Sequence, residues 1–263
     1  MFKNHPDPMR MEPTPERVLA VCKMIEKQPM PKEDLVQTMT LGGENPDVNA
    51  SIAVALEELH VIDQIDGKLK LVVPGAVLES PTAFRKYVSA KVFQNQASTF
   101  FRFSKWFIEQ NERIFALGKW EVLATTARSE SSALEGMNEN AVLGWRFWAA
   151  FLGLGYLSGT ILISNMKTRI QDVLSNEFSK QFVFDQAIRA EEFLDWIAPK
   201  IPEVDCRKEN LPLAFSAGLR TLNALGQVEL QVQRDTDVVR LYNVDGDPNN
   251  AFSHIIVREV VCK

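Results

Sequence analysis

Residues 55–72 read ALEELHVIDQIDGKLKLV, and the spacing of the apolar residues changes within this stretch. Up to Leu59 the apolar residues recur with the 3.6-residue period of a helix, whereas from Val61 onward they roughly alternate with polar residues, as in a strand. The dipeptide Asp66-Gly67 interrupts this alternation and favours the two-residue turn of a β-hairpin. The stretch therefore predicts an amphipathic helix that is followed directly by a hairpin.

Two more helices are expected upstream of this hairpin. Thr14 can cap a first helix, because Pro15 follows it at the first helical position. Prolines end that helix near residue 29, a short helix over residues 32–40 follows, and Asp47 can cap the third. Three short helices followed by a two-stranded ribbon, over residues 14–78, have the order of a winged helix-turn-helix.

The same order returns twice along the chain, which indicates a repeat. FWAAFLGLGYLSGTILI (147–163) and AGLRTLNALGQVELQV (217–232) both place a helical pattern before a β-rich run. For the C-terminal copy we predict a helix over 185–197, a helix from Ser216 to residue 225, a hairpin of residues 227–233 with 238–244, and a further strand over 253–261. This predicts a second winged-helix-like domain over residues 181–263.

The fold class predicted from these patterns is α+β and mostly helical, with an N-terminal winged helix, a central helical bundle over residues 79–180 and a C-terminal winged helix. Residues 147–164 carry no charge and are long enough to suggest a membrane span. Their glycines and β-branched residues favour instead a helix, a tight turn and a buried strand. Residues 1–13, which include three prolines and lack an apolar core, predict a flexible arm rather than a signal peptide.

The composition is that of an ordinary globular chain: 263 residues, of which 46% are hydrophobic and 24% charged. The three cysteines and three histidines are widely scattered, which argues against a disulfide framework and leaves little material for a metal site. A Walker loop, a GxSxG motif and an HExxH motif are all absent from the sequence. We therefore expect a cytoplasmic protein that is not an enzyme and has no cofactor or metal.

Charge is distributed unevenly along the chain. Residues 1–78 carry 8 Lys and Arg against 12 Asp and Glu, residues 79–180 carry 12 against 9, and residues 181–263 carry 9 against 13. Because Lys and Arg dominate affinity for a phosphate backbone, an acidic winged helix is a poor duplex binder. The expected exposed positions of the third N-terminal helix are Asn49, Ser51, Ala53, Glu57 and Glu58, a set without a basic residue. This set favours a protein partner.

Basic residues that would suit nucleic acid lie elsewhere. The segment 85–128 holds eight of them against three acids: Arg85, Lys86, Lys91, Arg102, Lys105, Arg113, Lys119 and Arg128. They alternate with aromatic residues, namely Tyr87, Phe93, Phe101, Trp106 and Trp120. This combination is typical of a nucleic-acid groove, but a solvated face above an aromatic core has the same pattern. The C-terminal copy adds Arg220 and Asn223 on its helix and Arg234 at the hairpin tip.

The chain resembles the accessory winged-helix proteins of prokaryotic phage-defence and DNA-modification islands, with the DpdG-like components as the nearest outline. The resemblance lies in ALEELHVIDQIDGKLKLV (55–72), WRFWAAFLGLGYLSG (145–159) and AGLRTLNALGQVELQVQRDTDVVRLY (217–242). The kite-type subunits of bacterial condensin-like complexes are similar in pairing two winged helices. The first resemblance implies a non-catalytic subunit that works beside helicases or nucleases, and the second implies winged helices that are used on protein as much as on DNA. Neither assigns a functional residue.

Three functions follow as expectations. The first is a non-catalytic subunit of a DNA-processing or anti-phage defence complex, which docks proteins through its winged helices and contacts nucleic acid through residues 85–128. The alternative is a dimeric, sequence-specific DNA-binding regulator that reads DNA with the C-terminal copy. The third is an enzyme with a carboxylate metal site formed by Asp235, Asp237, Asp245 and Asp247.

Overall fold

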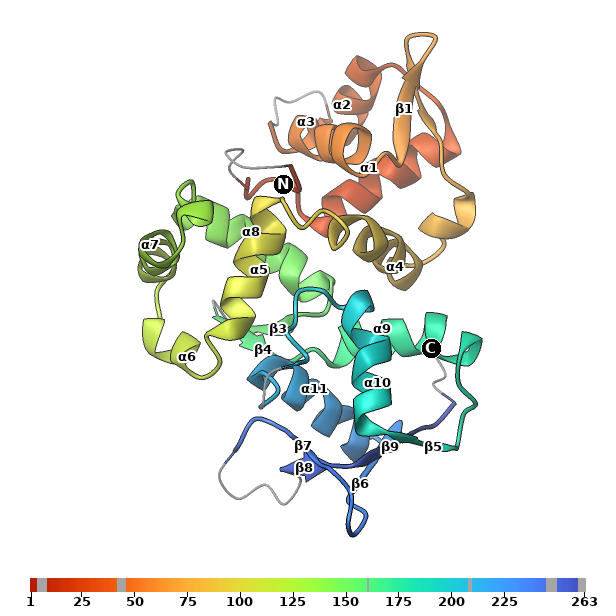
Figure 1. Ribbon diagram of the computed structural model, residues 1–263. Coiled ribbons are helices and arrows are strands. Elements are labelled where there is room, and N and C mark those ends of the chain that lie inside the picture. The colour runs from red at the N-terminus through yellow and green to blue at the C-terminus, as the bar shows by residue number, and fades with distance from the viewer. Residues whose placement is uncertain (4–8, 42–45, 160, 208–209, 245–249, 260–263) are drawn as a thin grey trace. The chain divides into compact units, whose positions relative to one another are not determined.

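The computed structural model describes residues 1–3, 9–41, 46–159, 161–207, 210–244 and 250–259. The structure is α+β with 54% helix and small antiparallel sheets, which confirms the predicted mostly helical class (Figure 1). The chain divides into two compact units, Met1–Phe103 with Gly118–Leu152 and Ser104–Leu117 with Gly153–Lys263. The central region, predicted as one bundle, is thus shared between the two units.

The first unit begins with the predicted helices and hairpin. Its first elements are α1 (Pro15–Lys27), α2 (Lys32–Thr40), α3 (Pro46–Ala53), a π-helical turn (Val54–Glu58), β1 (Ile62–Ile65) and β2 (Lys68–Leu71). The N-cap of α1 is Thr14, whose side chain accepts a hydrogen bond from the backbone NH of Arg17 at 3.4 Å. Asp66 and Gly67 have φ angles of +53° and +75°, as a type I′ turn requires between β1 and β2.

A third strand position completes this small sheet. Met30, between α1 and α2, bridges Leu69 of β2 in antiparallel fashion. The order across the sheet is therefore Met30, β2, β1. The inward faces follow the predicted helical period, because Val18 and Cys22 of α1 and Ile52 of α3 are buried.

The remainder of the first unit is helical and has an aromatic core. It contains a 3₁₀ turn (Gly75–Leu78), α4 (Pro81–Val92), the first part of α5 (Thr99–Glu109), α7 (Trp120–Glu130), a 3₁₀ turn (Ser132–Leu134) and α8 (Glu139–Phe151). Trp145 of α8 and Phe103 of α5 are fully buried and meet edge to face, with ring centroids 4.8 Å apart. Such pairs add to the free energy gained from area burial alone.

The N-terminal segment, which the sequence predicts to be a flexible arm, packs against this core. Met1, Phe2 and Met9 are buried, and the Phe2 ring lies edge to face on Phe100 and Trp148, at centroid distances of 5.1 and 4.9 Å. The indole NH of Trp148 donates to the carbonyl of Pro13 at 2.6 Å. For Met1, Phe2 and Met9 the prediction of a flexible arm is wrong, because single apolar residues among prolines show no period although these three are buried in the core.

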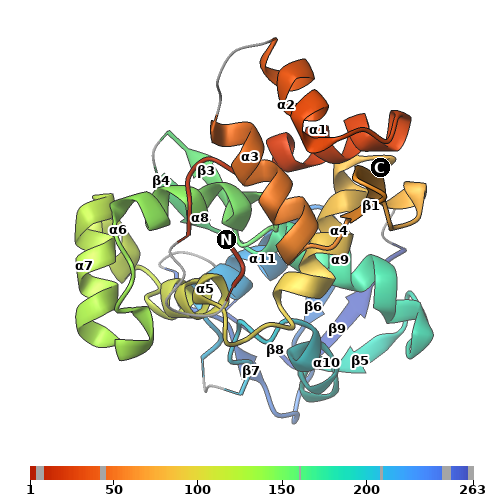
Figure 2. The ribbon, with the colours of Figure 1, turned by 90° about the horizontal axis from the view of Figure 1, so that it is seen from above.

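The second unit contains the remaining elements. They are the end of α5, α6 (Arg113–Leu117), β3 (Gly155–Ser158), β4 (Ile161–Ser164), α9 (Lys167–Glu177), a 3₁₀ turn (Phe178–Lys180), β5 (Ala187–Arg189), α10 (Ala190–Ile197), a 3₁₀ turn (Ala198–Lys200), α11 (Leu213–Ala224), β6 (Val228–Gln231), β7 (Val239–Arg240), β8 (Ala251–Phe252) and β9 (His254–Val257). Figure 2 shows β9 between β5 and β6, which is the order of the three-stranded antiparallel sheet.

Strand pairing in this unit differs from the prediction. The expected hairpin of residues 227–233 with 238–244 does not form; β6 pairs with β9, where Val228 faces Val257, and β7 pairs with β8. Val228, Ile255 and Val257 are buried, so the distant strand gains an apolar face that the nearby one does not offer. Of the further strand expected over residues 253–261, residues His254–Val257 form β9, and residues 260 and 261 lie outside the described residues.

Two helix starts in this unit also differ. The helix expected from residue 185 begins at Ala190, because residues 187–189 pair with β9 as β5. The helix expected to start at Ser216 begins at Leu213. Ser216 is buried, and its hydroxyl accepts from the NH of Tyr242 at 2.9 Å and donates to the carbonyl of Leu211 at 3.3 Å.

The uncharged stretch 147–164 forms the end of α8 and a hairpin rather than a helix and a single buried strand. Gly153 has a φ angle of +83°, and a Cβ there would lie 2.6 Å from the backbone nitrogen of Arg169, so the turn after α8 requires glycine. Within the described part of the chain, no helix combines the length and the apolar character that a membrane span requires.

Candidate interaction surfaces

The third helix of the N-terminal repeat exposes fewer residues than expected. Asn49 and Glu57 are exposed, and Ala53 is partly exposed. Ser51, however, is fully buried, and its hydroxyl donates to the carbonyl of Asp47 at 2.8 Å. The side chain of Glu58 is only 6% exposed. The surface available to a partner is therefore small and acidic.

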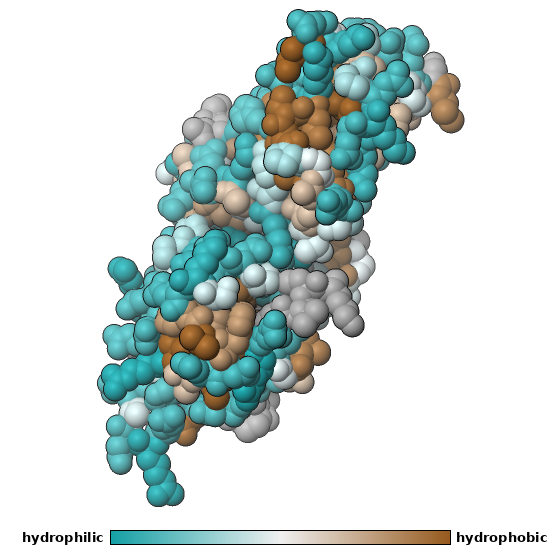
Figure 3. Space-filling model, turned by 90° about the vertical axis from the view of Figure 1, so that its right-hand side faces the viewer, coloured by the Kyte–Doolittle hydropathy of each residue, from teal (hydrophilic) through white to brown (hydrophobic). Residues whose placement is uncertain are grey.

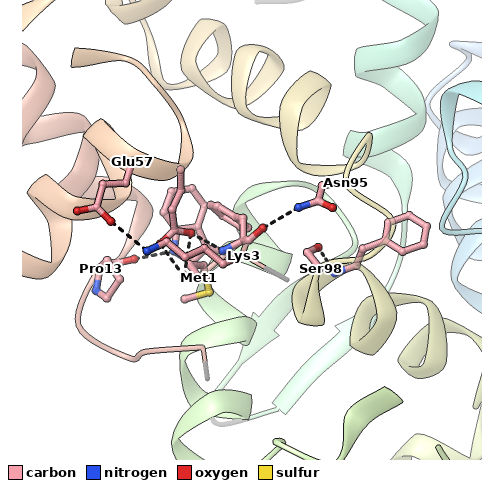
Figure 4. A network of polar contacts seen from close by, with 10 residues as sticks. Met1, Lys3, Pro13, Glu57, Asn95 and Ser98 are labelled. Carbon is pink, nitrogen blue, oxygen red and sulfur yellow. Dashed lines mark hydrogen bonds and ion pairs between the residues drawn. The ribbon is translucent and has the colours of Figure 1, made fainter. Parts of the chain in front are cut away.

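The N-terminal segment occupies the end of this helix (Figure 4). Lys3 Nζ pairs with Glu57 Oε2 at 3.0 Å, and the amino group of Met1 pairs with Glu58 Oε2 at 2.9 Å. The NH of Phe2 donates to Glu58 as well, and Asn95 Nδ2 donates to the carbonyl of Phe2 at 3.0 Å. The Glu58 carboxylate is thus used inside the unit, whereas Glu57 remains half exposed.

The equivalent helix of the C-terminal repeat, α11, is buried along one face and exposed at its end, at Ala224 and Leu225. Ala214, Phe215, Leu219 and Leu222 are buried. A Cβ at Gly218 would lie 2.8 Å from the backbone nitrogen of Lys167, so α9 begins in direct contact with α11. The first NH of the helix, that of Leu213, donates to Asn111 Oδ1 at 2.8 Å, and Thr221 Oγ1 accepts from Asn165 Nδ2 at 3.0 Å.

The two α11 residues predicted to contact nucleic acid have partners within the chain. A guanidinium nitrogen of Arg220 donates to the carbonyl of Tyr242 at 2.8 Å and to Asn250 Oδ1 at 3.3 Å. Asn223 Oδ1 accepts from the NH of Leu230 at 3.0 Å, which fixes the start of β6. Arg234 is exposed in the turn after β6, as expected. While these hydrogen bonds hold, Arg220 and Asn223 stabilise the fold rather than face a base pair.

The basic residues of segment 85–128 are spread over several helices. Six of them belong to the first unit: Arg85, Lys86 and Lys91 on α4, Arg102 on α5, and Lys119 and Arg128 at the start and end of α7. Lys105, at the other end of α5, and Arg113, on α6, belong to the second unit. The densest group is therefore the one on α4, which Arg102 follows in sequence.

Three of the five aromatic residues predicted to stack on bases are not accessible, because Phe93, Phe101 and Trp106 are buried in the core. Tyr87 is partly exposed, and its hydroxyl donates to the carbonyl of Leu59 at 3.0 Å. Trp120 is partly exposed as well, and the Arg146 guanidinium lies over its ring, 5.1 Å from the centroid. Most of the aromatic pattern is therefore that of a core.

An open pocket of about 800 Å³ lies in the second unit, where the start of α10, residues 206–207, the turn at 235–239 and the junction of β8 with β9 meet. Its charged lining residues are Arg189, Glu191, Asp195, Arg207, Asp235 and Asp237. The pocket is mixed in charge and has an excess of carboxylates.

Nucleophilic chemistry is not supported in this pocket. Burial, and then the carboxylates of Glu203 and Asp205, raise the pKa of the Cys206 thiol to about 12. Ser253 lies 3.0 Å from Nδ1 of His254, but Ser253 is buried and its hydroxyl already accepts from the NH of Gln233 at 2.8 Å.

The proposed carboxylate metal site is only partly visible. Asp235 and Asp237 are exposed in the turn after β6, whereas Asp245 and Asp247 lie outside the described residues. Within the described ranges, no three His, Cys, Asp or Glu residues cluster in a way that could hold a metal ion.

Apolar residues occur in separate patches on an otherwise largely hydrophilic face (Figure 3). In the second unit, a group of exposed apolar side chains lies on the β3–β4 hairpin, where Tyr156, Leu157 and Ile161 are 56%, 36% and 40% exposed. The sequence analysis missed this surface. Its signal was the long uncharged stretch, which we interpreted only as helix and buried strand.

Compared with known proteins, the chain matches no family model, and no curated protein or solved structure shows significant similarity to it.

Proposed function

We propose that the chain is a non-catalytic, protein-docking subunit built from two winged helices. Helix α9, strand β5, helices α10 and α11, and strands β6 and β9 follow the winged-helix order, and the sheet order β5–β9–β6 is the one expected for this fold. The first unit repeats this order with α1, the Met30 bridge, α2, α3, β1 and β2. Two equivalent sheets formed by distant parts of the chain support the repeat.

The observation that carries the docking function is the state of the two third helices. A winged helix that reads duplex DNA presents its third helix to the major groove, with donors for base edges and basic residues for phosphates. In this chain Arg220 of α11 is bonded to Tyr242 and Asn223 to Leu230, while α3 and its π turn present Asn49 and Glu57 without a basic residue. An acidic helix suits a protein partner better than a phosphate backbone.

The resemblance to accessory subunits of phage-defence and DNA-modification islands supplies the context. It suggests a larger DNA-processing or defence complex, with a helicase or a nuclease as the partner. This role does not require the catalytic sequence motifs that the chain lacks, and it uses neither the hydrogen-bonded Ser253 nor the buried thiol of Cys206.

A second candidate is a nucleic-acid contact through α4. Residues 80–108 contain five basic residues and no acidic residue. Four of the five, Arg85, Lys86, Lys91 and Arg102, belong to the first unit. Phe84 and Phe93 are buried and Lys91 Nζ lies over the Tyr87 ring, so such a contact would use phosphates and would have little sequence preference.

One titration separates these functions. The purified chain is added to labelled single-stranded DNA, duplex DNA and RNA at two salt concentrations, together with Arg85→Glu/Lys86→Glu and a control, Lys23→Glu/Lys27→Glu, from α1. Salt-sensitive binding that only the α4 variant loses would establish the nucleic-acid contact. Tight binding to one duplex, lost in Arg220→Ala but not in the α4 variant, would favour the regulator instead.

The docking function needs a positive test as well. A photo-reactive side chain at Asn49, on the exposed face of α3, is expected to crosslink one partner protein in cells that contain the intact chain. The same probe at Gln64 on β1 should capture the same protein, and a probe at Lys27 on α1 should not. Equal capture at Lys27, or no capture at Asn49 and Gln64, would contradict docking through this winged helix.

A further inference from the structure

The hairpin of β3 and β4 differs from every other described sheet in its charge. Each of the other three sheets carries at least one charged strand residue, such as Asp63 in β1, Arg189 in β5 and Arg240 in β7. The strands Gly155–Ser158 and Ile161–Ser164 carry none. Proteins commonly place charges on edge strands because a charge blocks pairing with another chain.

Strand β3 is the open side of this hairpin. In the antiparallel register Tyr156 faces Ile163 and Leu157 faces Leu162. Leu162 and Ser164 of β4 are buried, whereas Tyr156, Leu157 and Ser158 of β3 are all exposed. Among the described residues β3 pairs with β4 alone, so its other edge offers unpaired backbone groups.

We propose that β3 is a self-association edge, on which the β3 strand of a second copy of this chain pairs in antiparallel fashion to give a two-fold symmetric, four-stranded sheet. An antiparallel edge is complementary to itself, so the same strand serves on both copies. Because the edge is uncharged, pairing with its own copy removes no charge from water. If the partner strand carried charges, as strands of the chain's other sheets do, pairing with β3 would have to bury or displace those charges.

The net charge of the chain also favours self-association at the β3 edge. The chain carries a net charge of −5, so two copies repel each other unless they meet where charge is absent. Residues 147–164 form an 18-residue stretch without a charge, and its exposed part is this hairpin. Since an edge of four residues buries little area, the dimer is weak and depends on concentration. The dimer does not depend on the docking function, which uses α3 and the β1–β2 hairpin.

The test is the mass of the chain in solution. Sedimentation velocity from about 10 μM to about 1 mM should show the wild-type mass rising from the 29.7 kDa monomer toward the dimer. Tyr156→Lys should weaken dimerisation by about tenfold or more, since it places like charges across the two-fold axis. The matched control is Val183→Lys, because Val183 is an apolar residue of the same unit that is 62% exposed and belongs to neither strand of the hairpin.

A mixture of variants guards against a change of fold. Tyr156→Lys and Tyr156→Glu should each be monomeric alone and should form a heterodimer when mixed, because their charges then attract across the edge. Failure of the mixture to associate would overturn the proposal, as would a wild-type chain that stays monomeric over the whole range. A dimer that Tyr156→Lys retains, or that Val183→Lys loses equally, would place the interface elsewhere and would also overturn it.

Discussion

The two copies of the helix and sheet repeat use one order of elements in different ways. In the N-terminal copy the third helix presents the exposed side chains of Asn49 and Glu57, and Asp66-Gly67 closes a tight hairpin directly after it. In the C-terminal copy Arg220 and Asn223 of the third helix bond within the chain, and the strand after this helix pairs with one more than twenty residues away. The comparison shows that both copies share one order of elements, whereas the contacts around the third helix decide which of its side chains face solvent.

The first helices of the two copies differ as well. Arg169 of α9 and Glu203 form a buried ion pair at 2.8 Å, with side chains 6% and 0% exposed. Arg17 of α1 and Asp47 of α3 also pair at 2.8 Å, but their side chains are 49% and 27% exposed. The two ion pairs are equally short, but loss of one partner should lower the free energy of unfolding more for the buried pair. Only there does the remaining charge stay buried and uncompensated.

The largest effect is expected for Arg169→Met. The change leaves the Glu203 carboxylate buried without its counter-ion and also removes the donor to the carbonyl of Lys200, so the free energy of unfolding should fall by about 4 kcal/mol. Urea denaturation followed by circular dichroism measures the loss. The double variant Arg169→Met/Glu203→Leu should recover most of it, and equal losses in the single and double variants would show that the buried charge is not the cause.

Phe2→Ala should have the next largest effect, because Phe2, which precedes the N-terminal copy, packs into an aromatic cluster of the first unit. Removing a buried phenyl ring from between Phe100 and Trp148 should cost about 3 kcal/mol of unfolding free energy. Thermal unfolding measured by calorimetry tests this. The control is Lys3→Ala, which removes a side chain that is exposed and paired with Glu57. If both variants melted together with the wild type, Phe2 would not belong to the core.

Gly218→Ala tests how closely α11 is enclosed. At an exposed helical site this change would stabilise the protein by up to about 1 kcal/mol. At Gly218 the added methyl group meets the backbone of Met166 and Lys167, so we expect a loss of about 2 kcal/mol in urea denaturation. A gain in stability would mean that α11 is as open as α3, and the difference between the two copies would disappear.

The smallest effect is expected for Arg17→Met, the counterpart of the first variant. Its exposed ion pair with Asp47 should contribute about 0.5 kcal/mol, and the loss should shrink when salt is added. Parallel urea denaturations at low and high salt are sufficient. A loss as large as that of Arg169→Met would contradict the distinction between the two pairs.

Much of the N-terminal copy is predictable because its signals are local. Thr14-Pro15 specifies the start of α1, and Asp66-Gly67 specifies the turn between β1 and β2, each through neighbours in sequence. The pairing of β6 with β9 is not predictable from neighbours in sequence, because the pattern of residues 238–244 suits a strand that pairs with β6 equally well. The buried face of Ile255 and Val257 decides the pairing, and it exists only after the chain has folded.

The site residues divide along the same line. The basic and aromatic residues of segment 85–128 can be identified from the sequence. Only the structure shows that Phe93 and Trp106 are buried in the core, where they cannot stack on bases. The carbonyl of Tyr242 accepts from Arg220 across more than twenty residues, so no local pattern shows that this side chain is occupied.

The sequence by itself determined the mostly helical α+β class, the repeat of helix and strand, the first hairpin and the acidic character of the N-terminal third helix. These depend on period, turn chemistry and charge, which act between near neighbours. Tertiary structure alone decided that Met1 and Phe2 pack into the core, that Arg220 and Asn223 of α11 bond within the chain and that the uncharged hairpin exposes β3. Burial and long-range hydrogen bonds depend on which distant segments meet, and that is a property of the folded chain.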